Sequence, residues 1–183
     1  MSLLILCFCA AASAALLPAA ACKIDIERAM GTWYVQRAIP AIGALEKSAH
    51  NGVEEYVWDA ENECIDVTYT FNAGSLEGPT RTVRQRGWMQ DDLGTTWKIS
   101  PLIGGIRLPV KLPFIIIDID DKDYSYLTCS GGLDSWLYIM TREPKPTDET
   151  LAALEKAVEA IGFDASKLLP MPRGEVEEST STT

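Results

Sequence analysis

Short stretches in which apolar and polar residues alternate recur along most of the chain. The clearest lies between Cys64 and Phe71, where aliphatic and aromatic residues alternate with Asp66, Thr68 and Thr70. A period of two indicates a strand with one buried face and one solvated face. Turns rich in glycine, proline, asparagine and aspartate separate eight such strands, predicted at Thr32–Ala38, Val53–Trp58, Cys64–Phe71, Thr80–Gln90, Thr95–Ser100, Phe114–Ile119, Tyr124–Ser130 and in a last run that ends at Arg142.

A different period follows the strands. Apolar residues recur every three to four positions between Leu151 and Ile161, which is typical of a helix that packs one face on a core. Thr147 can cap its start and Gly162 its end. Because helices do not alternate with strands, we predict an all-β fold: an eight-stranded antiparallel up-and-down barrel with one C-terminal α-helix packed outside. Such a barrel encloses room for one small ligand.

Two segments interrupt the strand pattern near the expected mouth of the barrel. Residues 101–113 contain several prolines, which remove donors from a sheet, so we expect a loop or frayed edge there. The apolar run Ile39–Leu45 is long enough to fold over an opening. It could act as a lid or contact patch, or could pack against its own barrel.

A tryptophan and an arginine at opposite ends of the strand region are the most informative pair. Gly31 precedes the first strand and lets the backbone turn into it. Trp33 lies at the start of this strand, a position from which its indole can close the end of a barrel. Arg142 ends the strongly apolar last strand and can stack on that indole if the sheet closes on itself.

These residues carry a resemblance to a known family. Gly31-x-Trp33, Asp123-Tyr124 between two late strands, and Arg142 resemble the three signatures of the lipocalins. Within that family the chain is similar to the group of bacterial outer-membrane lipocalin, plant temperature-induced lipocalin and apolipoprotein D, over about Ile24–Pro172. The resemblance implies a barrel that binds a small hydrophobic ligand. It also implies a structural role for the five signature residues.

The side chains expected inside the barrel follow from the inward direction of Trp33 and Arg142. The candidate ligand-binding residues are Val35, Arg37, Tyr56, Tyr69, Gln85, Trp97, Ile99, Phe114, Ile116, Leu127, Trp136 and Tyr138. Most are aliphatic or aromatic, which suits an elongated apolar ligand, although they could instead fill a solid core. Arg37 could clamp a carboxylate, reach solvent, or pair with Glu46 or Glu54.

The termini suggest an extracytoplasmic protein. Residues 1–21 are apolar and end in small residues, as a signal peptide does, and 173–183 read as a disordered acidic tail. The domain would span residues 22–172. We expect secretion or another oxidising extracytoplasmic compartment, with a plastid lumen or an acyl anchor on Cys22 as alternatives. Apolar and basic residues in the 101–113 segment also suit a peripheral membrane contact.

Cysteine usage allows one disulfide in the mature chain. Removal of residues 1–21 leaves Cys22, Cys64 and Cys129, which permit three pairings. In an up-and-down barrel the N-terminal crossing and the turn before Cys64 lie at the same end. We therefore expect a bond between Cys22 and Cys64.

Charge and residue spacing argue against several partner classes. The net charge of −10 makes nucleic acid an unfavourable partner. With one histidine, His50, and no Cys-x-x-Cys, a zinc site is not expected, and the acidic turn Asp118–Asp123 lacks EF-hand spacing. No cofactor is expected. The oligomeric state is left open.

Besides membrane association through residues 101–113 or an acylated Cys22 to protect lipids, two functions compete at this stage. The first is a secreted protein that binds a fatty acid, lysolipid, carotenoid or similar lipophile, for transport or protection of lipids. The alternative is a lipocalin-fold enzyme that acts on a xanthophyll or lipid peroxide, with Cys129 or the carboxylates of Glu54 and Asp66 as candidate groups. No histidine or lysine lies near Cys129 in sequence to lower its pKa, so we favour binding.

Overall fold

The computed structural model describes residues 19–41, 46–103, 105–133 and 135–174. Most of the predicted signal peptide and most of the predicted acidic tail therefore lie outside the described residues. Residues 42–45 of the apolar run Ile39–Leu45 lie outside them too.

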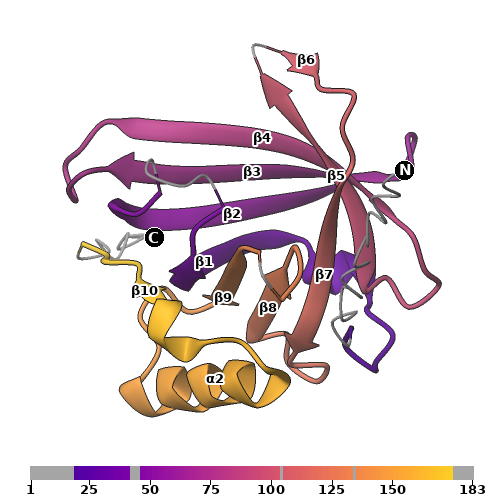
Figure 1. Ribbon diagram of the computed structural model, residues 1–183. Coiled ribbons are helices and arrows are strands. Elements are labelled where there is room, and N and C mark those ends of the chain that lie inside the picture. The colour runs from indigo at the N-terminus through magenta and orange to yellow at the C-terminus, as the bar shows by residue number, and fades with distance from the viewer. Residues whose placement is uncertain (1–18, 42–45, 104, 134, 175–183) are drawn as a thin grey trace, which may run out of the picture.

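Ten strands and two α-helices make up the described chain, as Figure 1 shows. The strands are β1 (Gly31–Ile39), β2 (Ala49–Asp59), β3 (Cys64–Ala73), β4 (Thr80–Met89), β5 (Thr96–Ile103), β6 (Ile106–Arg107), β7 (Leu112–Ile119), β8 (Tyr126–Ser130), β9 (Leu137–Thr141) and β10 (Leu169–Pro170). The helices are α1 (Ile26–Ala29) and α2 (Asp148–Ile161), followed by a short 3-10 turn, η2 (Ala165–Lys167).

The sheet closes into a barrel because its first and last long strands pair. Antiparallel neighbours run β1-β2-β3-β4-β5-β7-β8-β9, and β1 pairs in turn with β9, with Val35 opposite Met140 and Ala38 opposite Tyr138. The short strands β6 and β10 add to the edges of β5 and β1. The predicted eight-stranded barrel is confirmed.

Trp33 and Arg142 meet at one end of this barrel, as predicted. The Trp33 side chain is fully buried and its indole N–H donates to the Ala29 carbonyl (2.9 Å). The Arg142 guanidinium lies 3.6 Å from the indole ring centre. It also donates to the carbonyls of Thr32 (2.6 Å) and Met30 (2.7 Å). This arrangement seals the end of the barrel where β1 begins, which we call the closed end.

The Asp123-Tyr124 signature ties α1 to the closed end. Tyr124 takes a positive φ of 54° in the β7–β8 turn, and its hydroxyl accepts a hydrogen bond from the Asp25 N–H (2.7 Å). The Arg28 guanidinium stacks on the Tyr124 ring at 4.3 Å. Within the turn, the Asp123 N–H donates to the Asp120 carboxylate.

The helix α2 packs outside the barrel, below β8 and β9 in Figure 1. Leu154 and Val158 are its buried residues, and they belong to a second core cluster that includes Leu137 and Ile139 from the outer face of β9. Gly162 ends the helix with φ 109°, a conformation that favours glycine. The predicted cap at Thr147 is confirmed, since its side chain accepts from the Thr150 N–H.

Residues 101–113 are more regular than a loop. The strand β5 continues through Pro101 to Ile103, pairs with β6, and β7 begins at Leu112. Although Pro101 lacks an N–H, its carbonyl accepts from the Leu108 N–H (2.9 Å), so the hairpin keeps a backbone bond at this position.

The predicted disulfide between Cys22 and Cys64 is wrong. Both residues, and Cys129, are free thiols in the structure. Cys22 packs against the core inside the barrel, whereas Cys64 shares the outer face of β3 with Asp66. The two thiols belong to opposite sides of the barrel wall, so their presence at the same end of the barrel does not bring them together.

Candidate functional site

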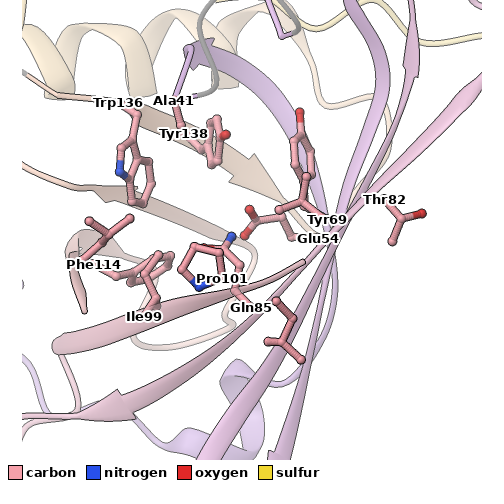
Figure 2. A pocket seen from close by; sticks show the side chains of 13 residues that line it. Ala41, Glu54, Tyr69, Thr82, Gln85, Ile99, Pro101, Phe114, Trp136 and Tyr138 are labelled. Atoms are coloured by element: carbon pink, nitrogen blue, oxygen red, sulfur yellow. The ribbon is translucent and has the colours of Figure 1, made fainter. Parts of the chain in front are cut away.

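A cavity of about 510 Å³ occupies the barrel at the end opposite Trp33. Ala41, which follows β1, lies at its edge, whereas Trp33 stands near the start of the same strand. The volume lies in the range of about 300–1,000 Å³ that is common for small-molecule sites. The lining residues are Ala41, Glu54, Tyr69, Thr82, Val83, Gln85, Ile99, Pro101, Leu102, Leu112, Phe114, Trp136 and Tyr138, most of them labelled in Figure 2.

Half of the predicted lumen residues line this cavity. They are Tyr69, Gln85, Ile99, Phe114, Trp136 and Tyr138. The strands place them there because side chains two positions apart on a strand point to the same side of the sheet. Phe114 and Trp136 approach each other with ring centres 5.5 Å apart, and Trp136 and Tyr138 at 5.2 Å. These contacts form an aromatic wall on one side of the cavity.

Five other predicted lumen residues fill the closed half of the barrel instead. Val35, Tyr56, Trp97, Ile116 and Leu127 are buried in the inner core cluster but do not line the cavity. The Trp97 ring stacks on Phe114 with centres 4.7 Å apart, which forms the floor between the two halves. The sequence left a packed core and an open cavity as alternatives. The barrel contains both: a packed core in its closed half and a cavity in the other half.

The expectation that Arg37 faces the lumen is wrong. A β-bulge between Val35 and Arg37 shifts the pairing of β1 with β9, so that Ala38 faces the core in its place. Arg37 instead points outward and its Nε lies 2.5 Å from a carboxylate oxygen of Glu155 on α2. A carboxylate clamp by Arg37 inside the barrel is excluded by this orientation.

Glu54 is an ionisable residue inside the barrel that the list of lumen candidates missed. Its side chain is 1% exposed and extends from β2 into the space enclosed by the side chains of Figure 2. The Tyr56 hydroxyl donates to its Oε2 at 2.5 Å. The signal was present in the sequence, because Glu54 and Tyr56 are two positions apart on one strand and so share a face.

Glu46 brings a second carboxylate to the same region. It is 3% exposed and accepts hydrogen bonds from the Tyr138 hydroxyl and the Ala41 N–H (2.7 Å). Burial raises the pKa of Glu54 to about 7; the Tyr56 hydrogen bond opposes this shift and the charge of Glu46 adds to it. Burial and Glu46 likewise raise the pKa of Tyr138, which therefore stays a hydrogen-bond donor.

Tyr69 adds a hydroxyl without a partner. Its oxygen is buried and makes no hydrogen bond within the described part of the chain. Burial and the nearby carboxylates of Glu46 and Glu54 raise its pKa, so the group is a neutral phenol. Tyr69 stands directly opposite Glu54 in the pairing of β2 with β3. A buried unpaired hydroxyl is costly unless something bonds to it, so a ligand with a polar end would find a partner here.

The other candidate groups, Cys129 and Asp66, are not among the residues that line the cavity. Burial raises the pKa of the Cys129 thiol well above its usual value, which disfavours the nucleophilic thiolate. Asp66 lies on the outer face, where it binds Arg86 (2.6 Å). Within the described ranges, no group of three or more histidine, cysteine, aspartate or glutamate residues could hold a metal ion. None of the helices in those ranges is long and apolar enough to cross a membrane.

Comparison with known proteins gives concordant results. The family model described as "Lipocalin-like domain" matches residues 24–173. Temperature-induced lipocalin-1 of Arabidopsis thaliana is 29% identical over 175 residues, which cover 87% of this chain and 84% of that protein. Both the family match and the relative extend over nearly the whole described chain.

Solved structures show the same fold at low identity. Insecticyanin from the tobacco hornworm Manduca sexta superimposes with a TM-score of 0.67 at 14% identity, covering 86% of this chain and 85% of that one. Lobster apocrustacyanin A1 gives a TM-score of 0.62 at 16% identity, with coverage of 82% and 81%.

Proposed function

The chain belongs to the lipocalin family, and from this premise we propose that it binds a small hydrophobic ligand inside its barrel, for transport or protection of lipids. The observation that carries the proposal is the cavity of about 510 Å³ and its aromatic wall of Phe114, Trp136 and Tyr138. Burying an apolar chain there would contribute about 0.8 kcal/mol per CH₂ group before ordering costs. Because Arg37 lies outside the barrel, the site we propose is built on apolar contact rather than on an arginine clamp.

Binding is favoured over catalysis for two reasons. Lipocalins are generally binding or transport proteins. In addition, Cys129 is buried behind the cavity lining with a raised pKa, so a peroxide in the cavity would meet no thiolate.

The compartment is part of the proposal. The signal-like residues 1–21 support secretion or delivery to another extracytoplasmic compartment.

We further propose a peripheral membrane contact at the β5–β6 hairpin. Ile106 is 73% exposed, and Val110 and Leu112 are also exposed. Arg107 and Lys111 lie over the Trp88 ring at 4.9 and 5.4 Å. Since Leu112 also lines the cavity, this apolar surface is continuous with its rim, and a ligand could pass between a lipid surface and the barrel.

A blocked cavity tests the binding proposal. Val83 lines the cavity and Arg84 is its exposed neighbour on the outer face of β4. Val83→Trp should fill the cavity and weaken binding of a neutral polarity-sensitive fluorophore at least tenfold, as measured by fluorescence titration. Arg84→Trp, the matched control, should bind as the unmodified protein does. Unchanged binding by Val83→Trp would place the ligand elsewhere and contradict the proposal.

A further inference from the structure

The polar side chains of the cavity lining carry carboxyl, hydroxyl and, at Gln85, amide groups, and no lysine or arginine is among the described residues that line it. Glu54 uses one carboxylate oxygen to accept from Tyr56, and no other hydrogen bond to Glu54 is formed within the described ranges. The nearest cations are held elsewhere. Arg37 pairs with Glu155, and Arg173 stacks on the Tyr34 ring and donates to the Gly52 carbonyl (2.7 Å).

We propose that the cavity selects a lipophile whose polar end is a cationic amine and discriminates against a carboxylate of the same chain length. The inference rests on the proposed function, because it names the class of ligand that the same cavity would take.

The pairing of β2 with β3 supplies the geometry. Glu54 and Tyr69 are direct partners across these strands, so their side chains leave the sheet as neighbours on its inner face. An ammonium group carries three donors and no acceptor. It can donate to the Glu54 carboxylate and to the Tyr69 oxygen at once, which gives both buried oxygens a donor and leaves the Tyr69 O–H directed at the nearby Glu46 carboxylate. A carboxylate could accept from the Tyr69 hydroxyl, but it has no proton to donate to Glu54, whose charge repels it.

The charges around Glu54 favour the same choice. The groups that face it are Glu46 from the segment before β2, Tyr56 on β2, Tyr69 on β3, Cys129 on β8 and Tyr138 on β9. The tyrosines and the cysteine are kept neutral by their raised pKa values, so the charged members of this set are carboxylates. The charge of Arg173 also acts on Tyr69, but its guanidinium stacks on Tyr34 and donates to the Gly52 carbonyl. A cation entering the cavity gains attraction that is strong where water is excluded, whereas an anion meets repulsion.

The rest of the cavity accommodates the apolar part of such a ligand. Ile99, Phe114 and Trp136 line the side formed by β5, β7 and the segment before β9, away from the Glu54 carboxylate on β2. An amphiphile can therefore lie with its amine at Glu54 and its chain along the aromatic wall. Binding buries the apolar chain and keeps the charged head group paired. A charge buried in an apolar site without a partner would be costly.

Three ligands of equal length test the proposal: dodecylamine, dodecanol and dodecanoic acid. Each is used below its aggregation concentration at pH 8, in competition with a neutral fluorophore bound to the full chain. The amine should bind at least tenfold more tightly than the acid, with the alcohol between them. In Glu54→Gln this preference should fall at least tenfold while affinity for the alcohol changes less than threefold.

Two comparisons make the test specific. Glu55→Gln removes the same charge from the exposed face of β2 and should leave the preference unchanged. In the unmodified protein the preference for amine should shrink between pH 8 and pH 6 as Glu54 becomes protonated, a measurement that does not depend on the variant folding. Retained alcohol binding shows that Glu54→Gln has folded.

The outcomes are distinct. Equal binding of amine and acid, or tighter binding of the acid, would overturn the selectivity and leave the proposed function standing. An equal loss of preference in Glu55→Gln would overturn it as well, because net charge would then be the cause. Failure of all three ligands to bind would overturn the proposed function and the selectivity together.

Discussion

Glu54 occupies a position where the barrel would otherwise bury an apolar side chain. Tyr56 donates one hydrogen bond to its carboxylate, which lowers its pKa. The loss of water around the carboxylate raises the pKa and is the larger effect. A buried carboxyl of this kind lowers the stability of the fold once it ionises. Residues that cost stability and line a cavity are candidates for a role in binding.

The stability of the protein should therefore fall as the pH rises through the pKa of Glu54. The unfolded chain loses this proton near pH 4.5 and the folded chain near pH 7, so the folded state binds more protons between these values. The contribution is fully present below pH 4.5 and is lost above about pH 7. Glu54→Gln should remove this decline and be more stable than the unmodified protein at pH 8, by at most about 3 kcal/mol.

Urea denaturation followed by tryptophan fluorescence at pH 5 and pH 8 measures the effect. Glu55→Gln, which changes an exposed carboxyl on the same strand, serves as the control and should keep the original pH dependence. An identical decline in Glu54→Gln would show that another group is responsible.

At the scale of elements, the β5–β6 hairpin is the feature that the barrel itself does not require. It projects from the body of the barrel in Figure 1, and its register is set by Leu102 opposite Arg107 and Ile103 opposite Ile106. The hairpin region carries an exposed isoleucine and two cations near the rim of the cavity. This combination of apolar and basic side chains suits contact with a membrane surface. The net charge of −10 makes zwitterionic lipid the appropriate surface.

Replacing Ile106 with aspartate should weaken partition of the protein onto phosphatidylcholine vesicles several-fold, because about 1 kcal/mol or more of apolar transfer is lost. Vesicle co-sedimentation gives the bound fraction. Leu93→Asp is the matched control, since Leu93 is also exposed but lies in the β4–β5 turn at the closed end. A comparable loss in both variants would contradict a contact specific to the hairpin.

At the scale of the whole molecule, the barrel is closed by residues from its two ends. Trp33 stands in β1 and Arg142 directly follows β9, and their stacking accompanies the pairing of these strands. The guanidinium donates hydrogen bonds to the carbonyls of Arg28, Met30 and Thr32 around the turn into β1. One side chain thus holds α1, β1 and β9 together.

Arg142→Lys should lower the free energy of unfolding by about 2 kcal/mol or more, because an ammonium keeps the charge but cannot bond three carbonyls in one plane while stacking on an indole. Chemical denaturation monitored by circular dichroism provides the value. Arg81→Lys, an exposed change near the start of β4, should cost less than about 0.5 kcal/mol. Equal effects from the two changes would argue that Arg142 is not the closing contact.

The local pattern of the chain determined the strands, the helix and its caps. These features follow from periods of two and of 3.6 residues and from residue types that fit one backbone conformation, all of which are properties of neighbouring positions. The same parity identified the six lining residues from Tyr69 to Tyr138 and also held the signal for Glu54 beside Tyr56.

The tertiary structure alone decided which side chains reach the cavity. The bulge after Val35 arises from how β1 pairs with β9, a strand more than 100 residues away, and it turned Arg37 outward. The opposite facing of Cys22 and Cys64 likewise depends on the path of the N-terminal segment inside the barrel. Glu54 and Tyr69 are neighbours only because of the register between β2 and β3. The alternation along one strand determines which face a side chain is on, but the partner strand determines which side chains lie next to it.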